Sequence, residues 1–197
     1  MNHSIGRLLS CILLAASLLS GCAAGYLLDN NVQAFSTLPA LPGQPTYRFE
    51  RLPSQQSPAQ AQLEAMADPA LHNAGLRRDD ANPRYSVQVG ARLQRELSPW
   101  ATPWDGWGWG GAGWGWGAGW GWGGYPFGRM ESPWYQREVS VIVRELASNR
   151  VVFESHAANE GPWLDNGSVF PAMFEAALRG FPNPPAGPRR VDIQIGG

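Results

Sequence analysis

Apolar and polar residues alternate along several short segments of the chain, with the period of two that is typical of half-buried β-strands. The clearest segment is 85–94, in which Tyr85, Val87 and Val89 alternate with polar residues. The same period predicts further strands at 46–52, 139–143, 151–157 and 191–195. Ser148 and Asn149 separate two of these strands as a tight turn, so the pair is predicted to be a hairpin.

A different spacing, of three and four residues, predicts a first helix that begins after Ser57 and ends at Gly75. Ser57 can cap this helix, and Gln60 is placed to complete a capping box. Pro69 interrupts the apolar stripe. It predicts either a kink or a second short helix that Asp68 would cap.

A second helix is predicted around 170–179, where phenylalanines recur at helical spacing and Gly180 follows. The order of strands and helices then predicts one α+β domain over 46–196, with a mostly antiparallel sheet and both helices packed on one face. Residues 22–45 are rich in X-Pro pairs and are predicted to be a tether, in which 32–35 could form a short edge strand.

The N-terminus has the pattern of a signal peptide over 1–21, with an apolar run that is too short to span a bilayer. The run ends in Leu19-Ser20-Gly21-Cys22, which resembles the lipobox of bacterial lipoproteins. The resemblance implies that Cys22 is acylated, as a palmitate-type lipid anchor, and becomes the mature N-terminus. Ala23 follows it, which implies sorting to the outer membrane of a Gram-negative cell, facing the periplasm. The alternative is an ordinary secretory signal that ends near a cysteine.

Composition removes several classes of function. The 197 residues carry 15 cationic and 16 acidic side chains, a formal charge of −1. The chain therefore has no net positive charge that would attract nucleic acid. Every cation is arginine, which excludes lysine-dependent chemistry. Loss of 1–21 would remove Arg7 and leave 14 arginines against 16 acids, a formal −2. Cys11 would be discarded and Cys22 acylated, leaving no free thiol or disulfide.

The most unusual segment is 100–127, a low-complexity insert of tryptophan and glycine between two predicted strands. Three interpretations remain open. It is a tolerated loop without a role, a membrane-surface contact through interfacial tryptophans, or a stacking surface for a sugar ring or a partner's apolar groups. The candidate stacking residues are Trp104, Trp107, Trp109, Trp114, Trp116, Trp120 and Trp122.

Motifs that carry catalysis are missing from the sequence. It contains no G-x-S-x-G elbow, H-E-x-x-H pair or Walker loop. His72 and His156 are far apart in the chain, so no metal site and no cofactor are predicted. Asp79 and Asp80 follow two arginines before a proline and are interpreted as solvated turn charges. We therefore expect a protein that is not an enzyme.

Several diffuse features together resemble one known family, the bacterial lipoproteins grouped as domain of unknown function 4136. These features are Thr46-Tyr47-Arg48-Phe49, the helix end Gly75-Leu76-Arg77-Arg78, the strand 85–89, the hairpin 139–153, and Phe181-Pro182. The resemblance implies a periplasm-facing envelope lipoprotein. It supplies no activity, and Cys22 is the only functional residue that carries over.

The expected function is a non-catalytic outer-membrane lipoprotein with a structural or binding role in the envelope. The alternative is a module that binds glycan or a membrane surface through 100–127. The expected partners are the membrane, through the lipid anchor, and a peptidoglycan, polysaccharide or envelope protein.

Overall fold

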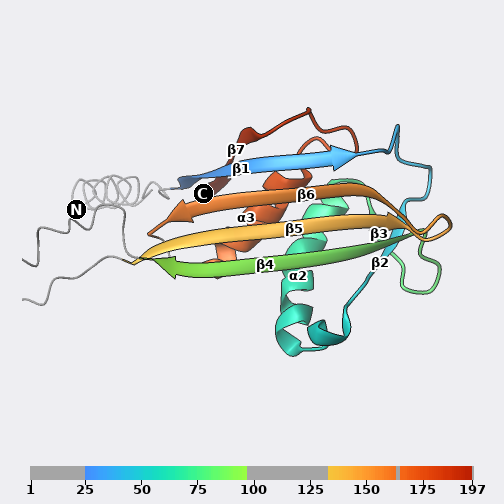
Figure 1. Ribbon diagram of the computed structural model, residues 1–197, viewed down its shortest axis with the longest axis horizontal. Helices are drawn as coiled ribbons and strands as arrows, with labels where there is room; N and C mark the ends of the chain where they lie inside the picture. The colour runs from blue at the N-terminus through green and yellow to red at the C-terminus, as the bar shows by residue number, and fades with distance from the viewer. Residues whose placement is uncertain (1–24, 97–132, 163–164, 197) are drawn as a thin grey trace, which may run out of the picture.

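The computed structural model describes residues 25–96, 133–162 and 165–196, which form a seven-stranded sheet in the order β3-β2-β4-β5-β6-β1-β7 (Figure 1). The short strand β2 runs parallel to β3 and β4, and every other pairing is antiparallel. The strands are β1 (Tyr26–Ser36), β2 (Thr46–Phe49), β3 (Arg77–Arg78), β4 (Tyr85–Glu96), β5 (Trp134–Glu145), β6 (Arg150–Gly161) and β7 (Arg189–Ile195).

Two helices, α2 (Pro58–Asn73) and α3 (Asn166–Leu178), cover one face of this sheet (Figure 1). The core lies between the layers and is built from every second residue of the central strands, among them Val87, Val141 and Phe153. A short 3-10 helix (Pro53–Gln55) precedes α2. The predicted α+β class, with a mostly antiparallel sheet, is confirmed for the described residues.

The start and end of α2 follow the sequence signals, but its interior does not. Ser57 caps the helix by accepting from the Gln60 N–H, and Gly75 follows it at φ +98°. Asp68 caps no second helix, because α2 runs unbroken through Pro69. Ala65, whose carbonyl this proline leaves without an N–H donor, is exposed to solvent, so water can replace the missing donor.

The side chain of Gln60 also departs from the predicted capping box. It donates to the Val89 carbonyl oxygen at 3.0 Å, linking the first turn of α2 to the central strand β4. Asp68 accepts a hydrogen bond from the buried Tyr47 hydroxyl of β2. Both polar groups of α2 therefore attach the helix to the sheet.

The tether predicted at 22–45 is wrong for residues 26–36, which form β1. This strand lies inside the sheet between β6 and β7, so the short edge strand expected at 32–35 is also wrong. Leu28, Val32 and Ala34 alternate into the core. Leu27 and Phe35 on the opposite face are 60% and 58% exposed, and these apolar residues hide the alternation in the sequence.

Five strand ends meet at one end of the sheet, which we call the Tyr26 end. Glu96 of β4 pairs with Trp134 of β5, and Tyr135 pairs with Gly161 at the close of β6. Tyr26 at the start of β1 pairs with Ile195 at the close of β7. The hairpin turn at 146–149 lies at the opposite end, between β5 and β6 as predicted.

Candidate binding depression

The sheet opens near the Tyr26 end because β1 changes partner along its length. From Asn31 to Ser36 it pairs with β6, whereas from Tyr26 to Val32 it pairs with β7. The first residues of β1 therefore diverge from the last residues of β6. One side-chain bond crosses the gap, from the Asn159 amide nitrogen to the Asp29 carbonyl oxygen at 2.8 Å.

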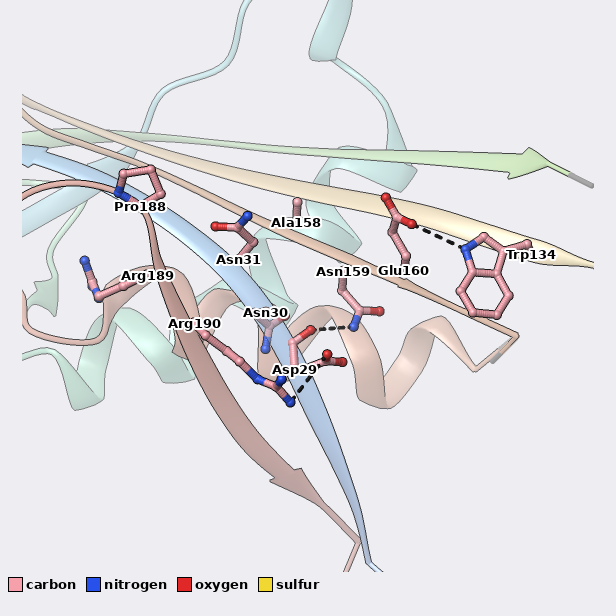
Figure 2. A pocket seen from close by; sticks show the side chains of 10 residues that line it. All are labelled: Asp29, Asn30, Asn31, Trp134, Ala158, Asn159, Glu160, Pro188, Arg189 and Arg190. Atoms are coloured by element: carbon pink, nitrogen blue, oxygen red, sulfur yellow. Dashed lines mark hydrogen bonds and ion pairs between the residues drawn. The ribbon is translucent and has the colours of Figure 1, made fainter. Parts of the chain in front are cut away.

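A depression of about 800 Å³ lies over this divergence and crosses β5, β6, β1 and β7 (Figure 2). Ala158 of β6 lies opposite Asn31 of β1, and its small side chain leaves space in the middle of the depression. The lining residues are Asp29, Asn30, Asn31, Trp134, Ala158, Asn159, Glu160, Pro188, Arg189 and Arg190. The volume lies in the range of small-ligand sites.

Two asparagines of this lining are buried and incompletely bonded. Asn30 is 1% exposed and donates to the Leu28 and Val191 carbonyl oxygens, both at 3.2 Å. Asn159 is 4% exposed and donates to Asp29. The Oδ1 atom of each has no hydrogen-bond partner among the described residues. A buried acceptor without a donor costs about 1–3 kcal/mol, so the site retains two polar groups at a cost in stability.

Arg137 extends the polar region beneath the depression. It lies opposite Asn159 in the β5–β6 ladder and is 2% exposed. Its Nε donates to the Asn166 Oδ1 at 3.0 Å, at the first residue of α3, and its guanidinium lies 5.1 Å from the centre of the Tyr135 ring. Burial lowers the pKa of the Arg137 guanidinium below its ordinary value. A buried cation in contact with an aromatic face is thus held at the Tyr26 end.

The charged groups of the rim already have partners. Arg190 pairs with Asp29 at 3.5 Å (Figure 2). It also pairs with Asp192 at 2.8 Å. Glu160 accepts from the Trp134 indole N–H at 3.5 Å. The Arg189 guanidinium turns to the end of α3 and donates to the Arg179 carbonyl oxygen at 2.5 Å. The depression therefore combines balanced charges with one indole and several amides.

The histidines and acids considered in the sequence lie elsewhere. His72 is exposed in the last turn of α2. His156 lies on the uncovered sheet face between Glu138, at 3.3 Å, and Glu154, at 3.0 Å. Asp79 accepts from two backbone N–H groups of the following turn. Across the described ranges, no three histidine, cysteine or acidic side chains are grouped to hold a metal ion.

The predicted lipidation residue, Cys22, and the candidate stacking tryptophans of 100–127 lie outside the described residues. The depression was missed because its residues come from four strands and form no motif. One signal was present in the sequence. The alternation of β5 and β6 assigns Arg137 and Asn159 to the same face as Val139 and Ala157, which marks them as buried polar residues.

Residues 32–183 match the family model described as a domain of unknown function (DUF4136). The chain belongs to this family. The DUF4136 match includes both helices and most of the sheet, but starts after Asp29 and ends before Arg190. No functionally curated protein matches the chain. The part of the chain that the structure describes contains no helix long and apolar enough to cross a membrane.

Three solved structures resemble the DUF4136 chain at low identity. A variant PelC dodecamer from Paraburkholderia phytofirmans is 16% identical, with a TM-score of 0.46, and the match covers 76% of this chain and 94% of that one. A second PelC dodecamer from the same organism is 13% identical, with a TM-score of 0.48, and covers 79% and 99%. A PDZ domain protein from Parabacteroides distasonis is 12% identical, with a TM-score of 0.48, and covers 92% and 41%.

Proposed function

We propose that the protein is a non-catalytic outer-membrane lipoprotein, anchored through acylated Cys22, with a structural or binding role in the periplasm. The observation that carries this proposal is the sequence Leu19-Ser20-Gly21-Cys22 at the end of a short apolar run. Burying acyl chains contributes about 0.8 kcal/mol per methylene, so such an anchor holds the protein at the membrane.

The position of β1 supports a domain held close to the bilayer. Tyr26 begins the strand four residues after Cys22, and four extended residues span at most about 14 Å. The Tyr26 end of the sheet would then face the membrane.

The two cysteines provide a matched test of the anchor. Cys22→Ser should abolish acylation and release the chain from washed membranes. Cys11→Ser, inside the signal, should leave acylation and membrane attachment unchanged. Mass spectrometry of the membrane-extracted protein should find a triacylated N-terminal Cys22. A mature wild-type chain that is soluble and unmodified would contradict the proposal.

A second candidate function is binding of glycan or of the membrane surface through 100–127. The supporting observation is that Glu96 and Trp134 flank this region and pair with each other at the Tyr26 end, close to the proposed anchor. Tryptophan favours the bilayer interface. Because Glu96 and Trp134 lie at the end of the sheet nearest the proposed anchor, this position favours a contact between 100–127 and lipid headgroups.

Removal of 100–127 from the Cys22→Ser chain tests this second candidate without the contribution of the lipid. Flotation with phospholipid vesicles and pull-down with purified sacculi should each retain the complete chain better than the shortened one. Equal retention of both chains would exclude a binding role for 100–127.

A further inference from the structure

The depression at the Tyr26 end has the features of a binding site, and its buried amides indicate what it binds. The unpaired Oδ1 atoms of Asn30 and Asn159 are acceptors that require a donor, either O–H or N–H. Figure 2 shows the Asn159 oxygen turned away from Asp29, on the side of the gap nearer Trp134. A ligand that donates hydrogen bonds would supply the donors that these two oxygens lack among the described residues.

The charges of the rim argue against a strongly charged ligand. Asp29 and Arg190 are paired at 3.5 Å, and the side chains are 57% and 66% exposed. The Glu160 carboxylate accepts from Trp134, and the Arg189 guanidinium donates to the end of α3. The lining carries two acids, Asp29 and Glu160, and two arginines, Arg189 and Arg190. Its charges therefore balance and favour neither a cationic nor an anionic ligand over a neutral polar one.

Trp134 adds a flat apolar surface at the edge of the depression. Its indole is half-buried, and the N–H is held by Glu160, which fixes one edge of the ring. Asn31 and Ala158 lie between this indole and Arg190, leaving an open floor. An aromatic face beside amide and carboxylate groups fits a ring with apolar faces and a hydroxylated edge.

We propose that the depression binds a neutral carbohydrate, with a sugar ring stacked on Trp134 and hydroxyl groups donating to the amide oxygens of Asn159 and Asn30. This site is distinct from 100–127 and goes beyond the proposed lipoprotein function, since it requires neither acylation nor the insert. The volume of about 800 Å³ accommodates more than one sugar ring.

The test uses the full chain, purified in a detergent without a sugar headgroup. The probes are two neutral tetrasaccharides, tetra-N-acetylchitotetraose and maltotetraose, measured by saturation-transfer NMR and calorimetry. The charged counterparts are the deacetylated glucosamine tetramer and a tetragalacturonate. At least one neutral probe should bind, and it should bind more tightly than either charged one. A charged probe that binds more tightly, or no transfer to either neutral probe, overturns the proposal.

Variants at the rim separate stacking from general structure. Trp134→Ala should weaken binding of the neutral probe by about tenfold, and Trp134→Phe by much less, because phenylalanine keeps a flat face. Phe35→Ala is the matched control, since Phe35 is an exposed aromatic on the same sheet face at the far end of β1. An unchanged Kd in Trp134→Ala, with an unchanged unfolding midpoint, refutes the proposal.

The chain without 100–127 distinguishes this site from the second candidate function. It should bind the neutral probe with the same Kd as the complete chain. If excision abolishes binding while Trp134→Ala does not, the insert is the binding element and the depression is not. Release of Cys22→Ser from membranes has no bearing on this result, so the two proposals fail independently.

Discussion

Replacement of Ser155 by alanine should destabilise the domain more than the size of the change suggests. Ser155 is fully buried on β6, and its hydroxyl donates to the Ala177 carbonyl oxygen at 2.7 Å. Because α3 ends at Leu178, Ala177 is among the last four residues, whose carbonyls have no donor within the helix. Ser155 therefore satisfies a buried helix end from the sheet.

The expected cost follows from this arrangement. The substitution loses a hydrogen bond worth about 1 kcal/mol and leaves a buried carbonyl without a donor, a penalty of about 1–3 kcal/mol that includes the lost bond. We expect a loss of about 2 kcal/mol. At about 2–4 °C per kcal/mol for a domain of this size, Tm should fall by about 4–8 °C.

Asn159→Ala is the informative comparison because it removes more atoms from an equally buried position on the same strand. It loses the bond to Asp29, worth about 1 kcal/mol, but also removes an unpaired oxygen whose burial costs about 1–3 kcal/mol. The variant also leaves the Asp29 carbonyl oxygen without this donor, so the penalty gained and the penalty removed are of similar size. The net change should lie within about 1 kcal/mol of zero.

Urea and thermal unfolding of the full chain, followed by circular dichroism, measure both variants. Ser155→Ala should be the more destabilised of the two. An Asn159→Ala variant that loses as much stability as Ser155→Ala would show that the Asn159 oxygen is satisfied in solution. It would also remove the energetic argument for the depression.

Three further predictions concern the rest of the domain. Replacing 100–127 with a four-residue turn should change stability by no more than about 2 kcal/mol, in the favourable direction, because closure entropy grows only logarithmically with loop length; a fall in Tm of many degrees would place the insert in the core. Arg51→Ala should lower the urea midpoint more than Arg179→Ala, because Arg51 holds the buried Glu64 through two bonds of 2.6 Å, whereas Arg179 and Glu175 are both exposed; equal shifts would contradict this. The Ser168 hydroxyl and the Gly167 N–H lower the pKa of Asp165 in the folded state. The ionised carboxylate therefore stabilises the fold above the ordinary pKa of aspartate, and this stabilisation is lost as pH falls through the lower pKa of the folded state. Between about pH 5 and about pH 2, Asp165→Asn should therefore lose less stability than the wild type, and parallel pH profiles of the two chains would refute this.

The sequence predicted the elements whose two faces differ most in polarity. In β4, Tyr85, Val87 and Val89 face the core, and the residues between them are polar, so the period of two is plain. The hairpin of β5 and β6 was predicted for the same reason. Its turn at Asn149 has φ 53°, a conformation that asparagine tolerates better than most residues.

The elements that were missed depend on contacts between distant parts of the chain. β1 has apolar residues on both faces and a buried Asn30, so its alternation is blurred, and only its pairing with β6 and β7 defines it. β3 has two residues and exists only because Thr46 and Tyr47 lie beside it. The depression likewise forms where β1 diverges from β6, and no local pattern encodes that divergence.

The meeting of five strand ends has a consequence for how far the molecule extends. β5 has 12 residues and runs from the Tyr26 end to the turn at 146–149, a length of about 40 Å at about 3.3 Å per residue. If Cys22 is anchored in the bilayer as proposed, the depression would open beside the headgroups, while that turn would point away from the membrane. A ligand of the depression must then be one that is available near the membrane surface. A label attached at Ser148 would instead report on the region about 40 Å from the Tyr26 end.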